Sequence, residues 1–339
     1  MANPRVCSKT ASELQEFSRY SFLFVIAAFA LGFGQMSFGQ SFPNRLVRVI
    51  VPFEAGTPDT LARLVAQQLT AQMGQTFLVE NRAGANGMIG ADVVAKSRPD
   101  GYTLMVTSTA LVVNPSVYKS IPYNTAKDFA PITNFASVDG LLLLVNPALP
   151  VHSLKELMAL GRAGNAYLSY ASAGFGNQLH VANELFNVRA GLNMVHVPYK
   201  GGGPAITALV GGDVQVMLMS PPPSLQLVKA GKLRALAYTH AKRASFLPEV
   251  PTMAEAGIPD LEIDGGWYGM FAPADTPRDL LNRLQSEVRT ALNFPKVRDA
   301  IIENGLTIVG DSTAAFTSFV DAEMKNYAER VRLTKIQPQ

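Results

Sequence analysis

Three loops rich in glycine, serine and threonine are the segments of this chain best suited to bind an anion. They are Phe53–Thr60, Ser172–Asn177 and Tyr199–Gly203, and each follows an apolar run and precedes a helical pattern. A helix that begins at such a loop presents free backbone N–H groups, and its dipole also favours negative charge. Because the same residue types also cap helices, one loop alone would favour capping. Three loops of one kind shift the interpretation towards a binding site.

Motifs for catalysis or metal binding are weak. The histidines His152, His180, His196 and His240 lack the H-x-x-x-H and H-E-x-x-H spacings, and no G-x-S-x-G nucleophile elbow occurs. His196 lies in an apolar run, which favours a structural, hydrogen-bonded imidazole. His180 lies near the second loop, and the sequence leaves open whether it touches a ligand or faces the helix. If the protein were an enzyme with a serine nucleophile, Ser172 and His180 would be the candidate nucleophile and base. No third residue that would orient the imidazole is evident.

Composition and charge exclude several classes of protein. The chain has 339 residues, 48% of them hydrophobic and 16% charged, and its 29 basic and 26 acidic residues give a formal charge of +3. This balance is not that of a disordered protein and gives no electrostatic footprint for nucleic acid. The glycines of Gly84–Gly90 are spaced G-x-x-G-x-x-G rather than G-x-G-x-x-G, so they do not favour a dinucleotide site.

The N-terminal residues 1–39 have the order of a secretory signal peptide. The apolar run Ser21–Gly34 is preceded by basic residues and followed by small residues at Ser37 and Gly39, and it is too short to span a bilayer comfortably. An uncleaved N-terminal anchor is the alternative. The sole cysteine, Cys7, lies in this segment, so the processed chain would carry no thiol, which suits an oxidising compartment such as the periplasm.

Short apolar runs alternate with helical patterns along the rest of the chain. Strands are predicted at Val47–Phe53, Thr76–Asn81, Tyr102–Thr107, Leu141–Val145, Leu168–Ala171, Met194–Tyr199, Val214–Met219, Leu233–Thr239 and Trp267–Ala272. Helices are predicted at Thr60–Met73, Ser153–Arg162, Gln178–Ala190, Pro204–Val210, Pro223–Ala230, Arg278–Leu292 and Ala314–Leu333. Continuous apolar strands of this kind indicate a doubly wound, mostly parallel α/β sheet covered on both faces. The only tryptophan, Trp267, follows a glycine pair, and the sequence leaves open whether it lines a cleft or fills core.

In order along the chain, these segments resemble one family, the periplasmic solute-binding proteins of tripartite tricarboxylate transporters, also called Bordetella uptake gene or TctC-like proteins. The matching segments are Val51–Phe53, Asp59–Arg63, Val79–Ala85 with Gly87 and Gly90, Pro99–Leu104, Asp128–Pro131, Tyr170–Ser172 with Gly174 and Gly176, His196–Gly201, Leu236–Thr239, Pro251–Gly257 and Trp267–Pro273. The resemblance covers nearly all of the chain after residue 39.

The resemblance implies a two-lobed α/β fold of the type II periplasmic-binding-protein kind, a Venus flytrap with discontinuous lobes. Residues 46–140 with 267–339 would form lobe 1, and residues 141–266 lobe 2. A small organic carboxylate would be held between the lobes by a monomer, with no catalysis, no cofactor and no metal. The expected partners are membrane transporter subunits or a sensor receptor, and not nucleic acid. A secreted α/β enzyme acting on a small carboxylated substrate is the alternative from a different class.

The resemblance also implies how the ligand carboxylate is bound, namely by backbone N–H groups, hydroxyls and ordered waters. The expected ligand-binding residues are Phe53, Ala55, Gly56, Thr57, Asp59, Ser108, Thr109, Ser172, Gly176, Asn177, His180 and Tyr199. The loop between Phe53 and Asp59 is one residue shorter than the usual family pattern and carries Glu54. Because a carboxylate pointing inward would repel an anionic ligand, Glu54 is expected to face solvent.

Export is the first testable prediction. The protein recovered from the periplasm should begin near Gln40, because the signal segment is expected to be cleaved after Gly39. Intact-mass measurement of the periplasmic protein checks this. Recovery of the chain in the membrane fraction with residues 1–39 still attached would contradict it.

Overall fold

The computed structural model describes residues 42–163 and 168–339, so the signal segment predicted at residues 1–39 lies outside the described residues. The compact unit runs from Arg45 to Gln339. Among the residues that the structure describes, no helix combines the length and the apolar character needed to cross a membrane.

The first sheet has six strands in the order β11-β4-β10-β3-β1-β2. Its strands are β1 (Val47–Val51), β2 (Phe77–Asn81), β3 (Thr103–Ser108), β4 (Phe129–Val138), β10 (Gly266–Pro273) and β11 (Thr307–Ile308). Strand β1 pairs in parallel with β2 and β3, whereas β10 runs antiparallel between β3 and β4, and β11 runs antiparallel to β4. The late strand β10 therefore lies inside a sheet whose other strands, apart from β11, come from residues 47–138.

The second sheet has five strands in the order β7-β6-β8-β5-β9. Its strands are β5 (Leu142–Val145), β6 (Ser169–Ser172), β7 (Val195–Pro198), β8 (Val216–Met219) and β9 (Arg234–Tyr238). Strand β6 pairs in parallel with β7 and β8, and β5 pairs antiparallel with β8 and β9. The parallel pairs place the ends of β6 and β7 side by side, so the loops that follow them are neighbours.

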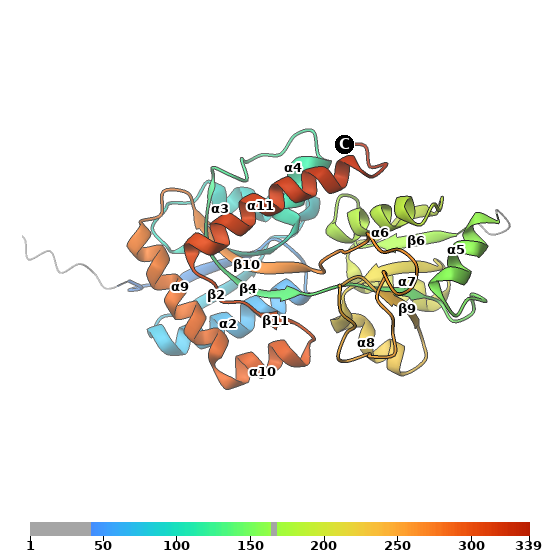
Figure 1. Ribbon diagram of the computed structural model, residues 1–339. Helices are drawn as coiled ribbons and strands as arrows, with labels where there is room; N and C mark the ends of the chain where they lie inside the picture. Colours follow the sequence, from blue (N-terminus) through green and yellow to red (C-terminus); the bar gives the residue numbers. More distant parts are fainter. Residues whose placement is uncertain (1–41, 164–167) are drawn as a thin grey trace, which may run out of the picture. The chain divides into compact units, whose positions relative to one another are not determined.

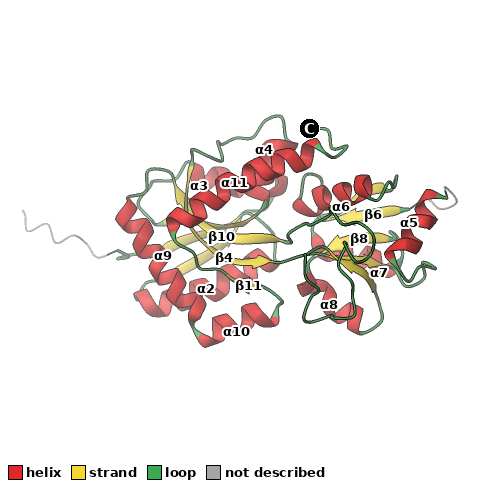
Figure 2. Cartoon of the chain, in the orientation of Figure 1, coloured by secondary structure: helices red, strands yellow, loops and turns green. Residues whose placement is uncertain are grey.

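Helices flank the strands of both sheets (Figure 2). They are α2 (Thr57–Met73), α3 (Met88–Ala95), α4 (Ala110–Val117), α5 (Leu154–Arg162), α6 (Gln178–Arg189), α7 (Gly202–Gly211), α8 (Pro221–Lys229), α9 (Arg278–Asn293), α10 (Pro295–Glu303) and α11 (Thr313–Arg332). A single 3-10 turn, η1 (Ala85–Gly87), precedes α3. Figure 1 shows α11, in red, running along the first sheet, and it packs on β4 and α4 and also touches α6.

Burial on both faces explains the continuous apolar strands. In the run Leu141–Val145, the odd-numbered leucines contribute to a core with α5 and α6, and the even-numbered ones contribute to a second core with α7. Successive side chains of a strand point to opposite faces, so a strand covered on both sides is apolar at every position. The prediction of sheets covered on both faces is confirmed for this strand.

The prediction of a mostly parallel sheet is wrong, because both sheets are mixed. The chief missing element is β4, which contains Pro131, a residue that cannot donate a hydrogen bond to a neighbouring strand. The structure accommodates Pro131 opposite Phe271, beside a shift in the β4–β10 register. The short helix α4 and the separate helix α10 that begins at Pro295 were also not among the predicted elements.

The chain leaves the first sheet after Val138 and returns to it at Gly266, and the two strands meet closely there. The Gly265 N–H donates to the Val138 carbonyl oxygen at 2.7 Å. A Cβ atom at Gly265 would overlap the Val138 side chain and lie 3.0 Å from the Gly140 carbonyl oxygen. Asp264 accepts a hydrogen bond from Arg330 of α11 at 2.7 Å, which ties the returning segment to the C-terminal helix.

Trp267 fills core instead of lining a cleft. Its side chain is 1% exposed and packs against Phe271, Phe316 and Phe319. Its backbone N–H donates to the Thr109 hydroxyl at 3.0 Å, and its carbonyl accepts from the Thr109 N–H at 3.2 Å. Of the two roles that the sequence left open, the structure therefore shows core packing beside the return of the chain.

A glycine substitution tests the close approach of the two strands. Gly265→Ala should lower the free energy of unfolding by about 1–3 kcal/mol, the usual cost of forcing an extra carbon into a packed site. Urea unfolding measures it. The matched control is Gly203→Ala in α7, where a Cβ would meet no atom within 4 Å, and there the helix-favouring change should be neutral or stabilising. Equal effects of the two substitutions would contradict the packing argument.

Candidate functional site

The loop after β1 is held by a closed polar network. Asp59 accepts hydrogen bonds from Arg63 Nε at 3.0 Å and from Asn81 Nδ2 at 2.9 Å, and Arg63 Nη2 also donates to Asn81 Oδ1 at 2.9 Å. Asn81 Nδ2 donates as well to the Phe53 carbonyl oxygen at 2.9 Å. Burial would raise the pKa of Asp59, but the hydrogen bonds from Arg63 and Asn81 outweigh it and lower that pKa. The carboxylate of Asp59 and the carbonyl of Phe53 thus shape the loop.

Three hydroxyl groups converge beside this loop. Thr57, the first residue of α2, has its side chain near that of Tyr268 of β10. Tyr268 pairs directly with Ser108 at the end of β3, and the Thr57, Ser108 and Tyr268 side chains are all partly exposed. Thr57 and Ser108 were predicted as site residues, whereas Tyr268 was not, because its strand β10 enters this sheet from a distant part of the chain.

The rest of the first loop faces solvent. Ala55 and Gly56 are exposed, and so is Glu54, which confirms the expected direction of that side chain. Thr109 is different, because it is fully buried and its hydroxyl accepts from the Trp267 N–H. Thr109 therefore braces β10 and is not within reach of a solute in this structure.

The second loop depends on a buried serine. Ser172, at the end of β6, is 0% exposed, and its hydroxyl donates to the Gly174 carbonyl at 3.1 Å and accepts from the Gly174 N–H at 3.2 Å. The same oxygen lies 2.6 Å from His196 Nε2. The interpretation of His196 as a structural, hydrogen-bonded imidazole is confirmed.

Side chains from the first sheet's half of the chain hold the tip of the second loop. Asn86 Nδ2 donates to the Gly176 carbonyl at 3.1 Å, and the Tyr118 hydroxyl donates to the Phe175 carbonyl at 3.1 Å. The Gly176 N–H donates to His180 Nδ1 at 3.1 Å. Gly176 has a φ of +69°, and a Cβ there would lie 2.8 Å from Val117, so only glycine fits. Gly176 and His180 thus support the loop through their own bonds.

His180 and His196 form a stacked pair of imidazoles. Their ring centroids are 3.8 Å apart with an interplanar angle of 10°, and the Tyr170 ring stacks on His196 at 5.0 Å. Burial lowers the pKa of His180 to about 3, with a further contribution from the charge of His196, and burial lowers the pKa of His196 to about 4. Both imidazoles are therefore neutral at pH 7.

The third loop lies against the second. The Tyr199 N–H donates to the Ser172 carbonyl at 3.0 Å, and the Gly201 N–H donates to the Ala173 carbonyl at 3.2 Å. Helix α7 begins after Gly201 without a side-chain cap, so the N-terminal N–H groups of α7 are not capped by their own Ncap residue. Asn177, by contrast, caps α6 by accepting from the Leu179 N–H at 3.0 Å.

The structure pairs Ser172 with His196, and not with His180 as the sequence suggested for an enzyme. The pair lacks two features of a nucleophile site. The hydroxyl is buried, and no carboxylate hydrogen-bonds to the His196 ring among the contacts of the described residues. An imidazole whose pKa lies near 4 is also a weak base at neutral pH.

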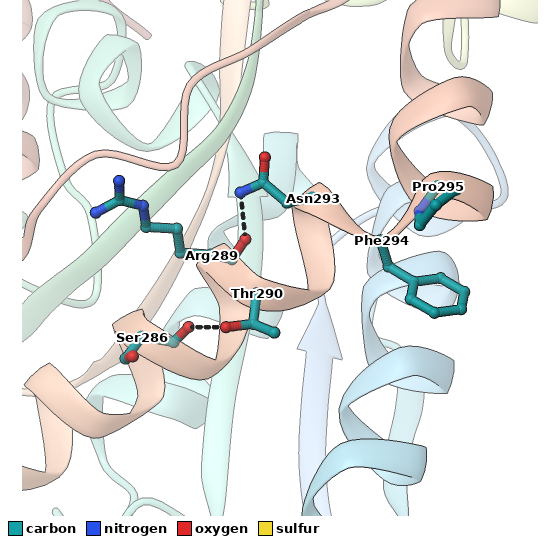
Figure 3. A pocket seen from close by; sticks show the side chains of 6 residues that line it. All are labelled: Ser286, Arg289, Thr290, Asn293, Phe294 and Pro295. Carbon is teal, nitrogen blue, oxygen red and sulfur yellow. Dashed lines mark hydrogen bonds between the residues drawn. The ribbon is translucent and has the colours of Figure 1, made fainter.

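The described residues also border two hollows, one away from the three loops and one next to Phe175 of the second loop. One is a groove at the junction of α9 and α10, bordered by Arg289, Phe294 and Pro295 (Figure 3). Thr290 Oγ1 and Asn293 Nδ2 there donate to carbonyls of their own helix. The other is a cavity of about 590 Å³ next to His180 and His196. In the described part of the chain, no three His, Cys, Asp or Glu side chains gather as they would around a metal ion.

Several residues at these loops escaped the sequence analysis. Asn81, Asn86 and Tyr118 position loop backbone through side chains that lie far from the loops in sequence. The available signal was Asn86-Gly87, a pair typical of a turn with positive φ, and Asn86 has a φ of +50°. Its partner Gly176 lies 90 positions away and could not be identified from one sequence.

Acidification tests the neutral imidazole pair. The unfolded chain, with ordinary imidazoles, takes up more protons than the folded chain between pH 6.5 and about 4, so the free energy of unfolding should fall as the pH falls. The stabilisation is complete above pH 6.5, and the loss by pH 4 should be roughly 1–3 kcal/mol after allowance for the part-exposed His196. Urea unfolding at a series of pH values measures it.

The variant His196→Gln should show a shallower pH dependence than the parent protein. The control is His152→Gln, because His152 is exposed and lies outside the stack. A parent unfolding free energy that stays constant between pH 6.5 and 4.5 would contradict the assignment.

Comparison with known proteins identifies the family that this chain matches. Residues 61–333 match the TctC family, described as the tripartite tricarboxylate transporter family receptor. Protein BugT of Bordetella pertussis is 37% identical over 298 residues, which cover 87% of this chain and 91% of BugT.

Solved structures agree with this match. R. palustris Rpa4515 with adipate is 34% identical with a TM-score of 0.82, covering 88% of this chain and 100% of that one. The periplasmic binding protein BugD is 31% identical with a TM-score of 0.80, at 88% and 100% coverage. MatC from Rhodopseudomonas palustris with bound malate is 31% identical with a TM-score of 0.77, at 86% and 100% coverage. The chain therefore belongs to the TctC family and has the two-lobed α/β fold of its periplasmic solute-binding proteins.

Proposed function

We propose that this protein captures a small organic carboxylate at the loops after β1, β3, β6 and β7. The observation that carries the proposal is that Thr57, Ser108 and Tyr268, three partly exposed residues with hydroxyl groups, lie beside the exposed residues Ala55 and Gly56. Neutral donors of this kind can hold a carboxylate through hydrogen bonds alone. Adipate and malate in two similar proteins support the class of ligand.

The charged groups near the first loop favour recognition by neutral groups. Arg63, the arginine on the first turns of α2, is engaged by Asp59 and Asn81 and makes no bond towards Thr57 in the contacts of the described residues. Glu54 is exposed, so its negative charge is screened by water. A carboxylate would therefore be bound by N–H and O–H donors, as in the predicted set that includes Phe53, Ala55, Gly56 and Tyr199.

We assign residues 46–140 with 267–339 to lobe 1 and residues 141–266 to lobe 2. The change of sheet between β4 and β5, and again between β9 and β10, supports these boundaries. Closure of the lobes would bring the loops after β1 and β3 towards those after β6 and β7. Ligand-binding residues at strand ends in both lobes are the usual arrangement for open α/β sheets.

The proposed setting is the periplasm, reached through the signal segment at residues 1–39, with the protein acting as a monomer. The partners are the membrane subunits of a tripartite tricarboxylate-type transporter, and the alternative partner is a sensor receptor that reads the liganded form. No cofactor takes part. The buried state of Ser172 and the low pKa of His196 favour binding without catalysis over the secreted-enzyme alternative.

A thermal-shift screen against adipate, malate, other di- and tricarboxylates and amino acids tests the function. A ligand present at 100 times its Kd should stabilise the folded protein by about 2.7 kcal/mol, which raises the melting temperature in a saturable way. Incubation of each stabilising acid with the protein, followed by mass spectrometry, should return it chemically unchanged. A carboxylate series that produces no saturable stabilisation, or a product that accumulates with time, would overturn the proposal.

Calorimetric titration of the identified carboxylate tests the site. Thr57→Val should weaken binding by on the order of 1 kcal/mol, about fivefold in Kd, because one hydrogen bond is lost. The control is Thr290→Val on the surface of α9, which should leave the Kd unchanged. Arg63→Gln should lower stability through the Asp59 network yet retain binding. Abolished binding in a folded Arg63→Gln protein would indicate an ion pair and contradict recognition by neutral donors.

A further inference from the structure

The cavity beside the imidazole pair is bordered by Phe175 of the second loop, but by no residue of the first or third loop. It has a volume of about 590 Å³ and lies between α6 and β7 on one side and the C-terminal residues 335–339 on the other. The C-terminal residues are fixed there by two backbone bonds, from the Lys119 N–H to the Gln339 carbonyl at 2.7 Å and from the Gln339 N–H to the Val117 carbonyl at 3.1 Å. Lys335 Nζ reaches across to Asn193 Oδ1 at 3.0 Å. The cavity thus has walls from both halves of the chain.

The lining combines positive charge with rings and apolar side chains. Lys119 and Lys335 supply two ammonium groups, and both are exposed at the cavity. The rings of Phe175, His180 and His196 lie against one another, with the Phe175 and His180 centroids 5.1 Å apart. Met194 and Ile336 add buried apolar surface.

One acidic side chain lies among these residues and is already engaged. Glu184 Oε1 accepts from the Tyr170 hydroxyl at 2.7 Å and from Asn187 Nδ2 at 3.3 Å. A ring wall next to ammonium groups suits a flat or apolar body that bears one carboxylate.

We propose that this cavity is a second binding site, which takes a small carboxylate with an apolar body. Lys119 and Lys335 hold the carboxylate, and the Phe175, His180 and His196 rings contact the apolar part. Such a ligand touches both halves of the chain, so it favours the arrangement in which they meet. The site stands independently of the proposed function.

Its coupling to the loops rests on the proposed function. The imidazoles that line the cavity also support the second loop, since His180 accepts the Gly176 N–H and His196 contacts the Ser172 hydroxyl. A ligand that fixes these rings therefore fixes the loop backbone, and binding at either site should strengthen binding at the other.

Proton NMR of the histidine rings with benzoate as the probe tests the second site. The chain has four histidines, so their ring resonances can be assigned by single substitution. Benzoate should shift the His180 and His196 resonances in a saturable way and leave those of His152 and His240 unchanged. The double variant Lys119→Gln/Lys335→Gln should weaken this titration at least fivefold. The matched double variant Lys229→Gln/Lys232→Gln, at the C-terminal end of α8 and just after it, should not.

The outcomes separate this site from the proposed one. Saturable shifts that persist unchanged in Lys119→Gln/Lys335→Gln, or no saturable shift at all, would overturn the second site. Thr57→Val should leave the benzoate titration unchanged while it weakens binding of the carboxylate found in the thermal screen. If that carboxylate instead shifted His180 and His196, required both lysines and ignored Thr57→Val, the placement of the proposed site would fail and the cavity would stand.

Discussion

The close approach of two strands where the chain re-enters its first sheet is the constraint on which the structure depends. The Gly265 N–H meets the Val138 carbonyl at 2.7 Å, which aligns β10 between β3 and β4. That alignment sets Tyr268 opposite Ser108 and lets Thr109 exchange two hydrogen bonds with Trp267. The strand that completes the first sheet therefore also supplies a hydroxyl group to the candidate site, although its residues lie about 160 positions from Ser108 in sequence.

The polar side chains near the loops mostly shape backbone. Asp59 binds Arg63 and Asn81, Ser172 binds Gly174, and Asn177 caps α6. Each of these residue types can hydrogen-bond to a nearby main chain, which is why they are common at turns and helix starts. A solute is then offered backbone and hydroxyl donors held in place by neighbours. The side chains of such a site therefore say little about which ligand it binds. Its glycines and short polar residues do indicate the geometry of the loops.

The sequence predicted what depends on local pattern and missed what depends on distant partners. The strand at Leu141–Val145 was predicted because double-sided burial makes every position apolar. Strand β4 was missed because Pro131 breaks that pattern, and the compensation comes from a register shift opposite β10. The three loops were identified from glycine, serine and threonine, but Tyr268 and Asn86 join them only through long-range pairing. Local chemistry thus indicated where a ligand could bind, and tertiary pairing decided which groups surround it.

The neutral imidazoles fit the second loop of a protein that is proposed to bind an anion. His180 accepts the Gly176 N–H, a task that a carboxylate could also perform, but a buried carboxylate would place negative charge beside the ligand. A lysine or arginine could not accept that N–H at all. Burial and the stacked partner keep the pKa of His180 near 3, so the ring accepts the bond without adding charge of either sign. The remaining N–H groups of the loop can then bind an anion, because the neutral ring of His180 does not repel it.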